Sequence, residues 1–199
     1  VQQAMHCLEL ARRAPSAFNT QPYRVILVHS KEQKMALSKF CLGPNGKRVL
    51  DSDCTAVFLA DREIFRTFPR FRSWLKETSK PNRIQSRKAL LTTQFYITLF
   101  SSGYPIPRLV AAPISFCVRT AVSFLHLFTK RFYPLPSLAN AETWSSKQVM
   151  LVAMTYMLGC SSRGIATAPM EGINASGMRK VLKVPRRYAI PMIVSTGLP

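Results

Sequence analysis

The sequence predicts an α+β fold in one domain of residues 1–199. Apolar residues recur at helical spacing in several segments, and short apolar runs typical of strands lie between them. Strands and helices alternate irregularly, whereas a parallel sheet would need a regular strand–helix–strand series. With 199 residues and 47% hydrophobic content, the chain is long and apolar enough to bury a substantial core.

The first sixty residues predict two helices and two strands. We expect a helix over 2–13, a strand over 23–29, a short helix over 31–40, a turn over 43–46 and a strong strand over 54–60. Residues 14–22 connect the first helix to the first strand, and they contain more polar side chains than a plain connection needs. This stretch is therefore a candidate for presenting hydrogen-bonding groups.

Residues 61–141 form a divergent helical and aromatic segment of the domain. Its aromatic residues at spacings of three predict a helix face interrupted by Pro69, and a further helix is expected over 85–101. Three prolines then break the chain before a helix over 114–128: Pro105, Pro107 and Pro113. The apolar stretches 109–118 and 120–129 fit either a membrane-facing hairpin or, as we favour, two helices that cover a core or a subunit interface. We expect no transmembrane segment.

The last sixty residues contain the longest predicted helix, over 142–158, where apolar residues recur at near-helical intervals. A loop is expected over 134–140 and irregular structure over 163–174. A short helix over 175–182 and a strand over 189–196 follow. Pro191 lies inside that strand, which indicates either an edge strand or a bulge.

The net charge of +19 is the most unusual feature of the composition. It fits an anionic partner, such as nucleic acid, an acidic membrane surface or a phosphorylated ligand. It fits equally a solvated basic surface. We favour the solvated surface and expect no specific nucleic-acid binding, because the basic residues are scattered and no RNA-binding or zinc-finger motif is present.

Cysteine and histidine usage predicts no metal site. The five cysteines include no C-x-x-C pair, and the three histidines are dispersed. Buried, reduced thiols in an intracellular compartment, either the cytoplasm or the mitochondrial matrix, are the expected state. Since the chain starts at Val1 without a Met and ends at Pro199, we expect both ends to be cut, so a targeting peptide would not be visible.

Four motifs carry the candidate chemistry. In order they are Pro15-Ser16-x-x-Asn19-x-Gln21-Pro22-Tyr23, Asn45-x-Lys47-Arg48-x-x-Asp51, Trp144-x-x-Lys147-Gln148-Val149 and Pro169-Met170-Glu171-Gly172. Together they resemble the FMN-dependent nitroreductase family, near its oxygen-insensitive NAD(P)H nitroreductase branch. The resemblance is strong over 2–60 and 142–199 and weak over 61–141.

The resemblance implies a nitroreductase-like fold: a central, mainly antiparallel sheet flanked by helices, in a domain-exchanged homodimer with the flavin site at the subunit interface. It implies FMN as cofactor and NADH or NADPH as co-substrate. Hydride would pass through flavin N5 to a small-molecule acceptor, a nitroaromatic, a quinone or a similar compound, in a ping-pong sequence. A flavin-free pseudoenzyme and a basic protein that binds nucleic acid or a membrane surface remain alternatives.

The resemblance also implies the site residues. The catalytic groups would be the backbone amide of Glu171, directed at flavin N5, and Arg48, whose charge stabilises the reduced ring. The cofactor-binding residues would be Pro15, Ser16, Asn19, Gln21, Asn45, Arg48, Gln148, Pro169, Met170, Glu171 and Gly172. Of these, the segment from Pro15 to Asn19 would contact flavin held mainly by the other subunit, and Gln148 would contact the partner's flavin.

Overall fold

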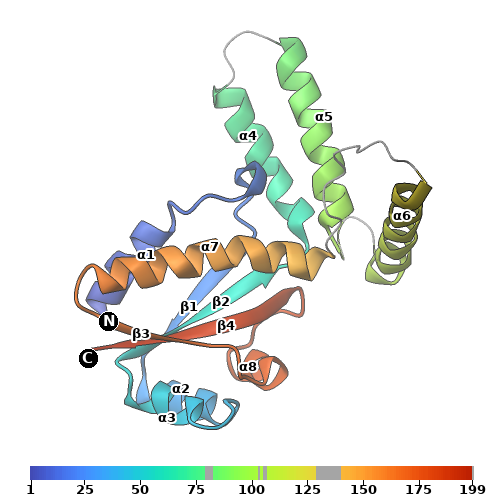
Figure 1. Cartoon of the computed structure of the whole chain (residues 1–199). Coiled ribbons are helices and arrows are strands. Elements are labelled where there is room, and N and C mark those ends of the chain that lie inside the picture. Colours follow the sequence, from blue (N-terminus) through green and yellow to red (C-terminus); the bar gives the residue numbers. More distant parts are fainter. Residues whose placement is uncertain (79–82, 103, 105–106, 129–139, 199) are drawn as a thin grey trace. The chain divides into compact units, whose positions relative to one another are not determined.

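The computed structural model describes residues 1–78, 83–102, 104, 107–128 and 140–198 (Figure 1). The chain divides into two compact units. The first contains Val1–Ala17, Gln21–Asp61 and Ser146–Pro199, and the second contains Phe18–Thr20 and Arg62–Ser145. Within the described residues, no helix is both long enough and apolar enough to cross a membrane.

A four-stranded antiparallel sheet forms the centre of the first unit. Its strands are β1 (Tyr23–Val28), β2 (Cys54–Asp61), β3 (Ala166–Met170) and β4 (Tyr188–Gly197), in the spatial order β1-β2-β4-β3. Each neighbouring pair is antiparallel; Tyr23 lies opposite Ala60, and Phe58 lies opposite Met192. The α+β class and the antiparallel sheet predicted from the sequence are therefore confirmed.

Pro191 lies in a central strand, because β4 pairs with both β2 and β3. The edge-strand alternative is thus wrong, and the bulge alternative is correct: the register between β2 and β4 shifts between Phe58 and Ala60, opposite Pro191. The irregularity removes the need for an N–H that proline lacks. It also changes which side of the sheet the side chains face, so Ile190 and Met192 belong to different core clusters.

Helices cover both faces of the sheet (Figure 1). On one face lie α1 (Gln2–Ala11) and α7 (Ala141–Ser161), and on the other lie α2 (Lys31–Ser38), α3 (Asn45–Asp51) and α8 (Ala175–Val181). Each face has its own apolar cluster: Phe58 and Tyr156 belong to the first, Leu37 and Met178 to the second. Every residue of β2 is buried, as expected of a central strand covered on both faces.

The sequence predicts four of these helices correctly and misses α3. The Gly43-Pro-Asn-Gly46 stretch is typical of a turn, but the helix begins at Asn45 inside it. The prediction of irregular structure over 163–174 is also wrong, because β3 occupies Ala166–Met170. Pro169 is tolerated there because β3 is an edge strand with one side free of ladder hydrogen bonds.

The second unit is helical in its described residues: η2 (Ile64–Thr67), α4 (Phe68–Thr78), α5 (Arg83–Phe100) and α6 (Arg108–Phe128). Pro69 does not interrupt a helix, because it lies in the first turn of α4, where a missing N–H costs nothing. Pro113 does not break the chain either; α6 continues through it as one helix rather than a pair. Pro105 and most of the predicted 134–140 loop lie outside the described residues.

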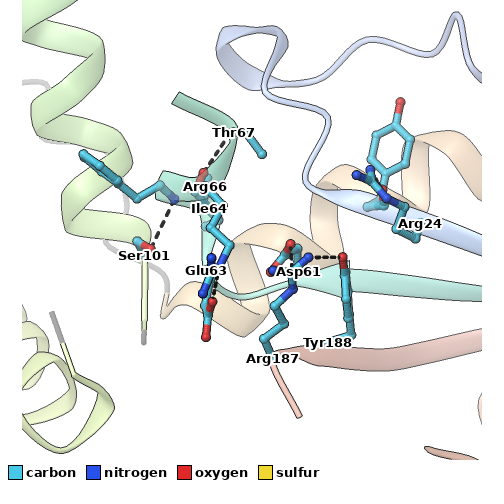
Figure 2. Close-up of polar contacts among 11 residues, drawn as sticks. Arg24, Asp61, Glu63, Ile64, Arg66, Thr67, Ser101, Arg187 and Tyr188 are labelled. Carbon is cyan, nitrogen blue, oxygen red and sulfur yellow. Dashed lines mark hydrogen bonds and ion pairs between the residues drawn. The ribbon is translucent and has the colours of Figure 1, made fainter. Parts of the chain in front are cut away.

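Figure 2 shows polar contacts near the ends of helices and strands, each within one of the two units. In the first unit, Arg187 Nε lies 3.4 Å from Asp61 Oδ2, and its guanidinium donates a 2.6 Å hydrogen bond to the Tyr188 hydroxyl. This ion pair joins the end of β2 to the start of β4. In the second unit, the Phe65 amide donates to Ser101 Oγ at 3.2 Å, which ties η2 to the residue that follows α5.

The expectation of buried thiols holds for three cysteines only. Cys7, Cys54 and Cys160 are buried, Cys41 is half-buried and Cys117, in α6, is exposed. Burial, followed by a hydrogen bond with Cys7, raises the pKa of the Cys160 thiol to about 12. This buried thiol therefore stays protonated near neutral pH and acts as a small apolar core group.

Candidate active site

The connection from α1 to β1 holds an uncommon backbone conformation. It contains a short 3-10 turn, η1 (Ala17–Asn19), and three residues other than glycine have φ in the left-handed region: Phe18 at 53°, Asn19 at 50° and Gln21 at 46°. Asn adopts this region readily, whereas Phe and Gln do so only when surrounding contacts hold them. The local sequence therefore does not by itself account for the shape of this loop.

Two hydrogen bonds fix the loop inside the first unit. Ser16 Oγ accepts from the Gln21 amide at 3.0 Å, which closes the loop on itself. Gln148 Oε1, on α7, accepts from the Ala17 amide at 2.8 Å, which ties the loop to the long helix. Phe18 and exposed Asn19 belong to the second unit, where the Phe18 ring stacks on Tyr96 of α5 with centroids 5.8 Å apart.

A second group of predicted residues meets where α3 begins. Asn45 Nδ2 donates to the Gly172 carbonyl at 3.3 Å, although 127 residues separate the two in the chain. A Cβ added at Gly172 would lie only 3.0 Å from that nitrogen. A side chain at position 172 would therefore crowd Asn45, whereas glycine leaves room for this close approach.

Arg48 completes this group one turn further along α3. Its Nη1 donates to Asn45 Oδ1 at 3.1 Å, so one amide side chain bridges the guanidinium and the Gly172 carbonyl. Arg48 is exposed and keeps further N–H donors that can face a ligand. The arrangement places a positive charge beside the Pro169–Gly172 turn.

The backbone of that turn offers a hydrogen-bond donor. Pro169 lies opposite Val194 and has no N–H, so the ladder bonds of β3 come from residues on either side of it. The Glu171 amide comes directly after Met170, the last residue of β3 that pairs with β4. Among the described residues this amide donates to no other group, while the Glu171 carbonyl accepts from Ile173 at 2.8 Å.

The structure thus brings the predicted residues together as two groups. Ser16, Gln21 and Gln148 form the first, next to Pro15; Asn45, Arg48 and Gly172 form the second, next to Pro169, Met170 and Glu171. Of all these side chains, that of Met170 is buried in a core cluster, so Met170 serves packing here.

Sequence reasoning missed the segment that holds the second group in place. The Leu42 amide donates to the Gly172 carbonyl at 2.9 Å, the Asn174 amide donates to the Phe40 carbonyl at 2.7 Å, and Cys41 forms a β-bridge with Ile173. These are backbone contacts, which no residue-type motif reveals. Burial raises the pKa of the Cys41 thiol, so this cysteine is a poor nucleophile at this site.

The second group has the chemistry that a flavin ring requires. A flat ring with a polar edge needs a few convergent donors and close approach of backbone. Exposed Arg48, the available Glu171 amide and the small Gly172 supply a cation, a neutral donor and space, respectively. The chemistry of these residues therefore fits FMN.

Comparisons with known proteins agree with this geometry. The chain is 23% identical over 190 residues to MhqN of Bacillus subtilis, a candidate NAD(P)H nitroreductase, covering 95% of this chain and 73% of that protein. The fold resembles ydfN of Bacillus subtilis, a candidate nitroreductase, with a TM-score of 0.67 and 20% identity, covering 100% of this chain and 78% of that one. It also resembles a candidate nitroreductase from Exiguobacterium sibiricum solved in complex with FMN, with a TM-score of 0.61 and 19% identity over 99% and 77% of the two chains.

A family model extends these likenesses to nearly the whole sequence. The model of the nitroreductase family matches residues 2–198, which include both groups of predicted site residues and the divergent 61–141 segment. The protein therefore belongs to the nitroreductase family.

Proposed function

We propose that this protein is an FMN-dependent oxidoreductase that transfers a hydride from NADH or NADPH to a nitroaromatic, a quinone or a similar acceptor. Family membership, the NAD(P)H nitroreductase relative and the FMN-bound structural neighbour support an NAD(P)H-dependent flavin enzyme. The acceptor class and a ping-pong order belong to the proposal. So does an intracellular location, in the cytoplasm or the mitochondrial matrix, because reduced nicotinamide nucleotides are intracellular substrates.

The observation that carries the proposal is the Arg48–Asn45–Gly172 chain of hydrogen bonds beside the Glu171 amide. Two stretches that lie more than a hundred residues apart in the sequence converge here, and their residue types are those that the family motif requires. When bound, FMN supplies hydride acceptance and donation at its ring. No side-chain nucleophile is needed for that chemistry.

The residues of this group would act by position and charge. Arg48 would stabilise the negative charge that develops at the polar end of a reduced ring, since a fixed cation is most effective where charge appears. The Glu171 amide would donate a hydrogen bond to the ring, and Asn45 would orient Arg48. Gly172 would keep the approach open.

The loop group would serve the site of a second copy. Pro15, Ser16 and Asn19 would form a wall against the partner's flavin, with Gln21 fixing the shape of the wall. An apolar stripe lies on α7, where Leu151, Met154 and Leu158 are exposed at spacings that share one helix face. Such an apolar stripe is typical of an interface, which supports a homodimer.

Arg48→Gln, compared with Lys47→Gln, tests the proposal. The two residues are adjacent on α3, but only Arg48 bonds to Asn45. In NADH and NADPH oxidation with a quinone or nitroaromatic acceptor, we expect the first change to lower kcat/KM about tenfold and the second to leave it unchanged. An FMN-saturated protein that oxidises neither nucleotide with any such acceptor would contradict the proposal.

A further inference from the structure

Helix α6 has an apolar half whose large side chains are exposed. Its exposed large apolar residues are Leu109, Val110, Ile114, Phe116, Phe124, Leu125, Leu127 and Phe128. Leu109 is 90% exposed, Leu127 is 80% exposed and Phe128 is 72% exposed. At 100° per residue, these eight positions fall within about half of the helix circumference.

The other half of α6 is less apolar in the sequence. Positions 108, 115, 119 and 126 recur at intervals of seven and four and so share one side of the helix, where the sequence has Arg, Ser, Arg and His. Ala111, Ala112 and Val122 lie on this half as well. Between Glu77 and Glu142 the chain contains eight Lys and Arg and no acidic residue. The segment is therefore both amphipathic and uniformly basic.

We propose that α6 binds the surface of a membrane that contains anionic lipid, lying parallel to that surface with its apolar half among the acyl chains. A helix with Leu and Phe on one face and basic residues on the other is the form that binds at a lipid interface. The anionic headgroups complement the positive charge of the segment and add attraction for each basic residue near the surface. This proposal does not depend on flavin chemistry.

A second copy of the chain is the less favourable occupant of this face. It would bring an equally basic segment against the first, since each chain has a net charge of +19. The stripe of Leu151, Met154 and Leu158 on α7 already offers an apolar surface outside this basic segment. The charge of the segment thus favours an anionic lipid surface over a like-charged copy.

Vesicle flotation with the full chain tests the proposal. One set of vesicles is pure phosphatidylcholine, and the other contains about a third phosphatidylserine. The variants are Phe124→Gln with Leu127→Gln, which removes apolar contacts, and Arg119→Gln, which removes one positive charge. Leu50→Gln, an exposed apolar position on α3, is the matched control.

We expect at least tenfold stronger partition onto the anionic vesicles than onto pure phosphatidylcholine. The Phe124/Leu127 double variant should partition more than tenfold more weakly, because each lost apolar side chain weakens insertion about tenfold. Arg119→Gln should weaken partition by about fivefold, and Leu50→Gln should leave it unchanged. Circular dichroism verifies that each variant is folded.

Three results would overturn the proposal. One is no flotation with either vesicle; another is flotation that the α6 variants do not change. The third is a double variant that shifts the chain from dimer to monomer in size-exclusion chromatography while vesicle binding is unaltered, which would assign α6 to a second copy. Flavin content and nucleotide oxidation are measured separately, so none of these results bears on the proposed enzymatic function.

Discussion

Gln148 is where the structure and the family resemblance make different predictions. The resemblance implies that its side chain contacts the partner's flavin. The structure shows its Oε1 accepting a 2.8 Å hydrogen bond from the Ala17 amide, in a loop where Phe18, Asn19 and Gln21 hold left-handed φ values. We expect Gln148 to act mainly as the anchor of that loop.

Gln148→Ala removes this bond, and Gln148→Glu keeps an acceptor at the same place. A hydrogen bond of this kind contributes about 1 kcal/mol. For a chain of this size that corresponds to a fall in Tm of about 2–4 °C. If the loop must be ordered to bind flavin, the same energy weakens FMN binding about fivefold.

The assay combines calorimetric melting with FMN titration by fluorescence quenching, applied to the wild type and both variants. Gln148→Ala should show both losses, and Gln148→Glu should remain close to wild type in both. If Gln148→Glu instead binds FMN as poorly as Gln148→Ala but melts at the wild-type temperature, the side-chain amide contacts the flavin directly. Gln148 would then not act mainly as an anchor of the loop.

Three further predictions concern packing, pH and assembly. Gly177→Ala should lower the free energy of unfolding in urea by about 2–4 kcal/mol, because its Cβ would lie 2.0 Å from a Phe40 ring atom. The control Gly164→Ala, at φ 68° in open space, should lower it by only about 1 kcal/mol. Equal losses in the two variants would contradict the packing explanation. Cys160 keeps its proton in the folded state up to a pKa of about 12, whereas an unfolded thiol ionises near 9. The contribution of this group to the free energy of unfolding should therefore be complete below pH 9 and fall as the pH rises from 9 to 12, by at most about 1.4 kcal/mol per pH unit. A urea midpoint that is constant from pH 8 to about 10.5 would refute that linkage. Leu158→Gln, in the exposed α7 stripe, should shift a dimer towards monomer in sedimentation, and an unchanged dimer would remove the stripe from the interface.

Elements whose burial pattern is local could be predicted from the sequence. β2 is buried on both faces and has a continuous apolar run, so its existence and bounds were clear. The apolar spacing in α7 predicts a helix of nearly the right length. Even Pro191 was informative, since a proline inside a strand restricts that position to an edge or a bulge.

The missed elements depend on distant contacts. β3 contains Ala, Thr and Pro169 and has no strong strand pattern; it exists because β4 offers hydrogen bonds along its other edge. α3 begins at Asn45 in a stretch that locally favours a turn, and Leu42 joins it to Gly172 across the fold. Local propensity cannot report such pairings.

The candidate site divides in the same way. The family resemblance implies Asn45, Arg48 and Gly172 as site residues, and the structure joins them in one hydrogen-bonded group; their role towards FMN stays a prediction. The hydrogen bond from Ala17 to Gln148 could not be predicted, since it joins a backbone amide to a side chain 131 positions away. Residue types thus indicate the ligand chemistry, whereas the contacts that hold the loop in place arise only in the folded chain.

Flavin retention tests the central claim most directly. The absorbance spectrum of the purified full-length protein is measured before and after FMN is added and the excess removed. We expect flavin bands at close to one FMN per chain, and Asn45→Ala, which breaks the link between Arg48 and Gly172, should retain measurably less. A wild-type protein that retains no flavin after this treatment would contradict the assignment of an FMN site to these residues.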